Sequence, residues 1–491
     1  MLECIVDVEE AMILATTECC HGAALFFDYS AAFPSLVHTF LWQALRAAGI
    51  PENVVCALQG LYKDNHHWLK WQPYAEPLLT VRSGVKQGCP LSPLLFIIAT
   101  EPVLRYLKSL LGPGDLLRGY ADDLAMVLKQ VWTTAPCLAQ AFVRVADITG
   151  LNLNTKKCVM VPLWIRPLGP LPLLEELVPL WRNFTIALNA KYLGIIIGPG
   201  GAEAGWVAAL RKFRSRVETI VSMPLGMFMT GLAYRIFALS TLSFIMQLTP
   251  VRQDWDQLQE DIGRKLAPGP YNWIPPRWLF DHRSDMTLPS MFVDLRALHD
   301  SVLIRTARSL TPTVRRAAAL RRSISADGEP IYHPWQAWRR APMVQLLADV
   351  RSESRAYMHP PDDKTSIQSH YYRQILDARP LEVESHTWER RLSKWRDLMY
   401  TPPYPRVLRA QAAKILVQTR RLPPSTRWAL VRTWFNGWCT ARHFQSSVSC
   451  FFCKAGEDSL EHMCRCPVIR LVGNSRLGLG LNASNPIHFS S

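Results

Sequence analysis

Three carboxylates in the sequence are placed as though they share a cation. Asp28 ends the apolar run AALFFD, and Asp122 and Asp123 lie in the acidic centre of LRGYADDLAMVL (117–128). Unpaired carboxylates are costly to bury, so such groups lie either at a turn open to water or around a metal ion. Two or three carboxylate oxygens suit Mg²⁺, and paired Mg²⁺ ions are the usual device for nucleotidyl transfer. An exposed acidic turn explains the pair Asp122 and Asp123 equally well.

A second group of metal-binding residue types lies near the C-terminus, in CFFCKAGEDSLEHMCRC (450–466). Cys450, Cys453, His462 and Cys466 have the spacing x2, x8, x3, which is compatible with one tetrahedral Zn²⁺ ion. Cys464 is a possible substitute for Cys466. The alternative is a small aromatic core with reduced cysteines.

Residues 401–450, which precede this group, combine positive charge with aromatic side chains. They contain eight Lys and Arg residues and no acid. The interleaved aromatic residues are Trp428, Trp434, Phe435 and Trp438. Cations that neutralise phosphates, beside rings that stack on bases, predict an RNA or DNA surface. A solvated charged face is the alternative.

The elements that must position the carboxylates alternate between strand and helix up to about residue 200. The run 23–28 predicts a buried strand, 117–128 a hairpin, and 191–198 a β-branched strand. Helical spacing is present in 35–50, in 83–111 after a Gly- and Pro-punctuated loop, and in 135–149. This order predicts an α/β or α+β domain.

Beyond residue 203 the pattern becomes helical. Three helices are predicted, over 204–221, 231–248 and 254–266, before the Pro-rich break APGPYNWIPPRW. Residues 280–400 read as mainly helical and rich in Arg. We therefore expect domains at 1–200, 201–270, 271–400, 401–449 and 450–470, with a flexible tail at 471–491.

Composition favours a globular protein with a polyanionic partner. The chain has 491 residues, of which 49% are hydrophobic and 19% charged, and its net charge is +15. Lys and Arg balance Asp and Glu over residues 1–300, so the whole surplus lies C-terminal to residue 300. The acidic N-terminus, scattered cysteines and lack of a long apolar run predict an intracellular protein of cytoplasm and nucleus, neither secreted nor transmembrane.

Five stretches occur in an order that carries more information than any one of them. They are FFDYSAAFPSL (26–36), SGVKQGCPLSPLLF (83–96), GYADDLAMVL (119–128), TGLNLNTKKC (149–158) and KYLGIIIG (191–198). In this order the chain strongly resembles the reverse transcriptase palm of non-LTR (LINE-type) retrotransposons. The stretches look like motifs A, B, C, D and E of that family.

The resemblance implies roles for individual residues. Asp28, Asp122 and Asp123 would bind two Mg²⁺ ions. Lys157 would donate a proton to the leaving pyrophosphate, with a solvated surface lysine as the alternative. Phe33 would be the steric gate against a ribose 2′-hydroxyl, with core packing as the alternative. Gln87, Gly88, Tyr29 and Tyr120 would contact the substrate, and Tyr192, Leu193 and Gly194 would form the primer grip.

The implied fold is an α+β right-hand palm, an antiparallel sheet with packed helices. A helical thumb and a helical, basic C-terminal region with a small zinc knuckle would follow it. The implied partners are an RNA template, a DNA primer or target, and deoxynucleoside triphosphates, with no membrane partner.

The resemblance has limits. Only 27 residues precede Asp28, where the family places a fingers subdomain, so we expect an N-terminally truncated copy with partial fingers. Two other functions stay open. One is a non-catalytic RNA- or DNA-binding remnant that acts through the basic C-terminal region, and the other is a group II intron maturase.

Overall fold

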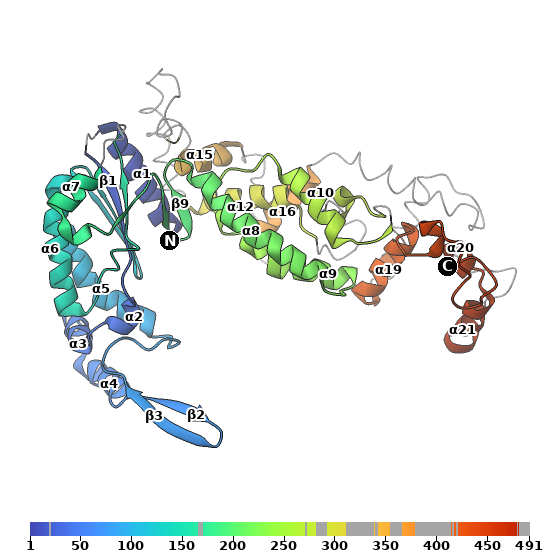
Figure 1. Ribbon diagram of the computed structural model, residues 1–491, viewed down its shortest axis with the longest axis horizontal. Coiled ribbons are helices and arrows are strands. Elements are labelled where there is room, and N and C mark those ends of the chain that lie inside the picture. Colours follow the sequence, from blue (N-terminus) through green and yellow to red (C-terminus); the bar gives the residue numbers. More distant parts are fainter. Residues whose placement is uncertain are drawn as a thin grey trace. The chain divides into compact units, whose positions relative to one another are not determined.

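The computed structural model describes residues 1–18, 21–164, 170–270, 273–280, 292–310, 338, 342–353, 366–378, 414, 417–418, 421–478 and 480. They divide into two compact units, whose helices and strands Figure 1 labels. The first unit comprises Met1–Trp206 and Ser309–Asp349, and the second comprises Val207–Arg308 and Val350–Ser491.

A five-stranded sheet is the centre of the first unit. Its order is β4 (Leu116–Tyr120), β5 (Asp123–Leu128), β1 (Ala23–Phe27), β6 (Val159–Pro162) and β7 (Thr185–Ile186). All neighbouring strands are antiparallel except β6 and β7. All five residues of β1 are buried, which is why this central strand reads as a continuous apolar run. The predicted α+β class is confirmed.

Helices cover both faces of this sheet. One face packs on α5 (Ser92–Ser109) and α6 (Val131–Thr149), where Leu25, Phe27 and Met126 join one hydrophobic cluster with Phe142. The opposite face carries α1 (Leu2–Glu18) and the small hairpin of β8 (Ala190–Tyr192) and β9 (Ile195–Ile197). In Figure 1, β1 lies between α6 and α1.

A second hydrophobic cluster lies under the N-terminal half of α5. It includes residues of α2 (Ala32–Ser35), α3 (His38–Ala47) and α4 (Glu52–Tyr62). After α4 the chain forms a separate hairpin of β2 (His66–Trp71) and β3 (Tyr74–Thr80). The sequence reasoning assigned no element to this hairpin.

The described elements of the second unit are helical. They are most of α8 (Gly201–Val221), then α9 (Met227–Ala233), α10 (Trp255–Leu266), α11 (Pro276–Phe280), α12 (Leu295–Ser309), the end of α15 (Met343–Glu353), α16 (Ile367–Asp377), α19 (Pro424–Trp434), α20 (Leu460–Met463) and α21 (Pro467–Leu477). The helices predicted over 204–221 and 254–266 are confirmed. The prediction for 280–400 falls largely outside the described residues. None of the described helices has the length and hydropathy that a membrane crossing requires.

The single helix predicted over 231–248 is wrong. After α9 the chain makes a π-helical turn at Tyr234–Ala238 and short 3₁₀ turns at Leu239–Thr241 and Ile245–Gln247. The hydroxyls of Ser240, Thr241 and Ser243 donate hydrogen bonds to carbonyls three residues earlier. Such local bonds compete with the regular helical ladder, which explains why an apolar helical pattern fails here.

Aromatic side chains fill the core of the second unit. Tyr234 lies 5.9 to 6.1 Å, between ring centroids, from Phe213, Phe280 and Phe292. Phe292 in turn contacts Trp428 of α19 at 5.9 Å. The segment around α19 is therefore part of this core.

Candidate active site

The sheet brings Asp28 and Asp123 to the same edge. Phe27, the last residue of β1, pairs with Leu124 of β5, so the next position along places Asp28 opposite Asp123. Directly opposite residues of antiparallel strands share a face of the sheet. Asp122 lies next to Asp123 in the turn between β4 and β5, where Tyr120 pairs with Asp123 and Ala121 has φ +55°. The three carboxylates therefore gather at one end of two adjacent strands.

Their charges are incompletely compensated. Asp122 and Asp123 are exposed and the Asp28 side chain is 40% exposed. Partial burial raises the pKa of Asp123, and the charges of Asp122 and Asp28 raise that pKa further, whereas Lys191 lowers it. Like charges that disfavour each other's ionisation fit a site for a divalent cation.

A turn over residues 152–158 holds Asp28 in place. The backbone N–H of Asn154 donates to the carbonyl of Asp28 at 2.8 Å, and that of Ser30 donates to the carbonyl of Asn152 at 2.8 Å. The backbone N–H of Asp28 donates to Cys158 Sγ at 3.4 Å. Burial raises the pKa of Cys158 to about 11, so the group beside Asp28 is a neutral thiol at neutral pH.

The same turn places a cation beside Asp28. Lys157 Nζ lies 3.8 Å from Asp28 Oδ2, and the Lys157 side chain is 70% exposed. An ion pair this exposed contributes little to stability. Its position beside the carboxylates and open to solvent suits a role in chemistry.

Phe33 contacts α5 and the loop 83–91. Its ring stacks on Phe96 of α5, with centroids 4.5 Å apart and an angle of 11° between the planes. Its carbonyl accepts a hydrogen bond from Val85 N at 2.8 Å. Gly84 has φ +84°, and a Cβ there would lie 2.5 Å from the carbonyl oxygen of Pro34. Phe33 is partly buried against the second hydrophobic cluster, which supports the packing alternative for this residue.

The other predicted substrate residues differ in exposure. Gln87 and Gly88 are exposed, and Gly88 has φ +83° with open space around it. Tyr120 is 46% exposed. Tyr29 packs against both hydrophobic clusters, and burial raises the pKa of its hydroxyl.

The predicted primer grip is a tight hairpin. Leu193 and Gly194 both have positive φ, of 47° and 87°, as a type I′ turn between β8 and β9 requires. The single strand predicted over 191–198 is therefore wrong. Tyr192 is buried, with its ring 5.6 Å from Phe26 and its hydroxyl donating to the carbonyl of Arg118 at 3.5 Å.

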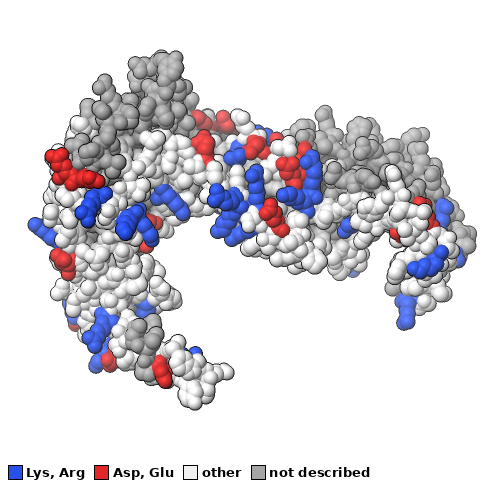
Figure 2. Space-filling model, viewed as in Figure 1, with Lys and Arg blue, Asp and Glu red and all other residues white. Residues whose placement is uncertain are grey.

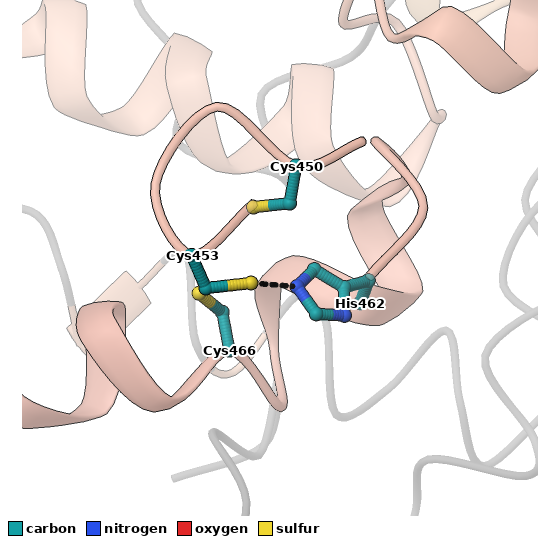
Figure 3. Close-up of side chains that lie close together, drawn as sticks. All are labelled: Cys450, Cys453, His462 and Cys466. Atoms are coloured by element: carbon teal, nitrogen blue, oxygen red, sulfur yellow. Dashed lines mark hydrogen bonds between the residues drawn. The ribbon is translucent and has the colours of Figure 1, made fainter. Parts of the chain in front are cut away.

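Four potential zinc ligands converge in the second unit. One ligand atom from each of Cys450, Cys453, His462 and Cys466 lies within 4.8 Å of the others. Figure 3 shows the three thiols and the imidazole pointing toward one another. Cys453 Sγ and His462 Nε2 are 3.1 Å apart. Cys464, the possible substitute, does not belong to this group.

The backbone around these four residues favours the binding of a cation. Hydrogen bonds from the backbone N–H groups of Ala455 and Gly456 lower the pKa of Cys453 to about 6. A Cβ on Gly456 would lie 2.1 Å from ring atoms of His462, so this glycine makes room for the imidazole. Ser459 Oγ caps α20 by accepting from His462 N at 3.1 Å.

The aromatic residues of segment 401–450 do not form the predicted stacking surface. Trp428, Trp434 and Phe435 are 2%, 3% and 0% exposed, so the prediction is wrong for these three. They pack inward because α19 is a core helix of the second unit. Trp438 is 37% exposed, and the Arg432 guanidinium lies 4.9 Å from its ring centroid.

Comparison with known families decides what the first unit is. The family of reverse transcriptases (RNA-dependent DNA polymerases) matches residues 9–197, a range that contains Asp28, Asp122, Asp123, Lys157 and Tyr192. The first unit contains a reverse transcriptase domain. The zinc-ligand group lies outside the matched range.

The relatives of this reverse transcriptase domain are of the non-LTR retrotransposon type. The chain is 32% identical over 153 residues to the Pol polyprotein of the retrotransposable element R2DM of Drosophila melanogaster, and 29% identical over 212 residues to an R2 Pol polyprotein of Popillia japonica. These matches cover 30% and 40% of this chain but only 14% and 29% of the polyproteins.

A solved telomerase from Candida albicans, in complex with a fragment of telomeric RNA, is also similar. The identity is 12% and the TM-score 0.26, over 54% of this chain and 46% of that chain.

Sequence reasoning missed two neighbours of the carboxylates in the reverse transcriptase domain. Cys158 contacts Asp28 across 130 residues of sequence, and Lys191 acts on Asp123 from β8. Both lie inside or directly beside quoted motifs, but only the fold shows which carboxylate each one faces.

Proposed function

We propose that this chain is an RNA-directed DNA polymerase that adds deoxynucleotides to a DNA 3′-end on an RNA template. The observation that supports this most strongly is the gathering of Asp28, Asp122 and Asp123 at one sheet edge within the matched domain. Their incompletely compensated charge fits two Mg²⁺ ions. When bound, these ions supply neutralisation of charge at the attacking oxygen and at the leaving group.

In the proposed reaction a primer 3′-hydroxyl loses its proton to water and its oxygen attacks the α-phosphorus of a deoxynucleoside triphosphate. A new phosphorus–oxygen bond forms, the bond to the β-phosphate bridging oxygen breaks, and pyrophosphate leaves. Lys157 would give its Nζ proton to that pyrophosphate, and its exposure and the 3.8 Å between its Nζ and Asp28 Oδ2 support this role.

Substrate contacts are assigned to the surrounding elements. Phe33 would reject a 2′-hydroxyl with its partly exposed ring, and Gln87, Gly88, Tyr29 and Tyr120 would line the template and nucleotide site. The turn of Tyr192, Leu193 and Gly194 would hold the primer. Residues 1–200 would be a palm with partial fingers, and 201–270 a thumb.

The second unit is proposed to hold the nucleic acid. Figure 2 shows Lys and Arg side chains, with some Asp and Glu among them, on one face over α8 and α10. The exposed basic residues there are Arg211, Lys212, Arg214, Arg264 and Lys265. Cys450, Cys453, His462 and Cys466 would bind one structural Zn²⁺ ion, since three thiolates and one imidazole are a closed ligand set for this metal.

A second candidate function is binding of RNA or DNA without catalysis. It is favoured by the convergence of four zinc ligands in a basic region outside the matched domain. This alternative uses none of the three carboxylates.

Primer extension distinguishes the two functions. The purified chain is supplied with an RNA template, an annealed DNA primer, deoxynucleotides and Mg²⁺, and is compared with the Asp122→Asn, Asp123→Asn double variant. Extension by the wild type alone supports the polymerase. Salt-sensitive RNA binding with no extension by either protein supports the binding function.

A further inference from the structure

We infer that the hairpin of β2 and β3 is a binding element for single-stranded nucleic acid, with Trp68, Trp71 and Tyr74 as its stacking residues. The inference deepens the proposed function. It rests on that function only for the identity of the strand, which would be the unpaired template.

The hairpin exposes large apolar side chains that nothing in the described part of the chain covers. Trp68 is 60% exposed, Trp71 51%, Tyr74 63% and Leu69 43%. Among the described strands, β2 and β3 pair only with each other, and Figure 1 shows the hairpin projecting from the end of α4. A two-stranded hairpin is marginally stable in water on its own, so these rings are better explained by a ligand than by folding.

The strand register puts aromatic rings on both faces. Trp71 pairs with Tyr74, and Leu69 pairs with Glu76, so these residues share one face. Trp68 and Lys70, two residues apart on β2, share the other face. Each face of the hairpin thus presents an aromatic ring, and on one face the ring of Trp68 lies beside the cation of Lys70.

Local charge favours a polyanion as the occupant. Residues 61–86 contain Lys63, Lys70, Arg82 and Lys86 against Asp64 and Glu76, within a region 1–300 that has no net charge as a whole. Three of the four exposed apolar side chains are aromatic and therefore stack on any base. Exposed rings combined with a cationic excess fit a single strand better than they fit an apolar protein surface.

The place of the hairpin in the chain connects it to the active site. β3 ends at Thr80, and the loop that carries Gln87 and Gly88 begins at Ser83. Backbone hydrogen bonds from Gly84 to the carbonyl of Leu36 and from Val85 to that of Phe33 anchor this loop beside Phe33. A strand bound on the hairpin would therefore continue toward residues already assigned to the template.

The test measures binding directly, by fluorescence anisotropy of labelled oligouridylate and oligothymidylate with the full chain. The Trp68→Ala, Trp71→Ala, Tyr74→Ala variant is expected to weaken binding about tenfold or more, since each lost stack contributes independently of sequence. The Trp68→Phe, Trp71→Phe, Tyr74→Phe variant retains the rings and is expected to bind nearly as the wild type does. Lys70→Gln is expected to reduce the slope of log affinity against log salt by about 0.7.

Equal affinity of the wild type and the triple alanine variant would overturn the inference. So would a self-association, measured by sedimentation, that the alanine variant loses while its oligonucleotide affinity is unchanged. The Asp122→Asn, Asp123→Asn variant should bind the oligonucleotides normally. A failure of primer extension would therefore not change the result of this binding measurement.

Discussion

Cys158 Sγ lies 3.4 Å from the backbone nitrogen of Asp28, although 130 positions separate the two residues. With the hydrogen bond from Asn154 N to the Asp28 carbonyl, it fixes the backbone of this aspartate on both sides. The position of a proposed metal ligand thus depends on a buried thiol in a different motif.

Replacing Cys158 should slow chemistry without weakening template binding. Cys158→Ala leaves the Asp28 N–H without its partner, and one such hydrogen bond contributes about 1 kcal/mol. We expect the rate of single-nucleotide incorporation to fall about fivefold, the rate equivalent of that energy. Cys158→Ser keeps a donor and acceptor and should retain most of the rate. An unchanged rate in the alanine variant would show that the contact does not position Asp28.

Lys157 should contribute to the rate of nucleotide incorporation by donating its Nζ proton. Lys157→Met is expected to lower the incorporation rate about 10²-fold, the lower end of general acid catalysis. Lys156, the adjacent exposed lysine, provides the matched control, and Lys156→Met should leave the rate within about twofold of the wild type if only local acid catalysis is lost. Equal losses in the two variants would indicate a general electrostatic effect on nucleic-acid binding instead of proton donation.

The zinc site can be tested at a residue that is not a ligand. Gly456→Val would push the new side chain into the His462 ring, which lies 2.1 Å from the position of a Cβ at residue 456. We expect the variant to lose bound zinc, as measured by atomic absorption, and to become sensitive to protease in the region 450–466. Cys464→Ser should keep its zinc. Zinc retained by Gly456→Val would contradict the proposed ligand set.

Stability should depend on pH through Glu9. This carboxyl is 2% exposed, with Met343 N donating to it at 2.6 Å and Trp338 Nε1 at 3.3 Å. Burial raises the pKa of Glu9 from 4.5 to about 7, despite these hydrogen bonds, which lower it. The protonated form is favoured by folding. The contribution of Glu9 to the free energy of unfolding is therefore fully present below about pH 4.5 and is lost as pH rises toward about 7.

The free energy of unfolding is expected to fall by about 3 kcal/mol as the pH rises across this interval. Denaturant midpoints measured at about pH 5 and about pH 8 would report it, and Glu9→Gln should flatten the dependence. Glu3→Gln, at an exposed position of the same helix, is the control and should leave the pH dependence of the midpoint unchanged. A wild-type midpoint that rises between the two pH values would contradict the assignment.

Local patterns were sufficient for the strands and the turn that carry the three carboxylates. The run 23–28, the acidic hairpin and the helices over 204–221 and 254–266 were predicted because burial and periodicity in these segments agree with local propensity. The hairpin of β2 and β3 was not predicted, since its exposed rings and irregular alternation lack a buried face.

Long-range contacts explain the remaining failures. Nothing in the sequence indicates that α1 covers the sheet, or that Glu9 contacts residues more than 300 positions later. Trp428, Trp434 and Phe435 were interpreted as surface residues because basic residues surround them. Their burial depends on partners such as Phe292, which lies more than 130 positions earlier.

The most direct test of the account is single-turnover incorporation of one deoxynucleotide on an RNA–DNA template–primer, measured across Mg²⁺ concentrations for the wild type and Asp123→Asn. The account predicts Mg²⁺-dependent incorporation by the wild type and a loss of about 10³-fold or more in the variant, with template–primer affinity unchanged, since charge stabilisation is the main source of catalysis in nucleotidyl transfer. Incorporation by Asp123→Asn at the wild-type rate and Mg²⁺ dependence would contradict it.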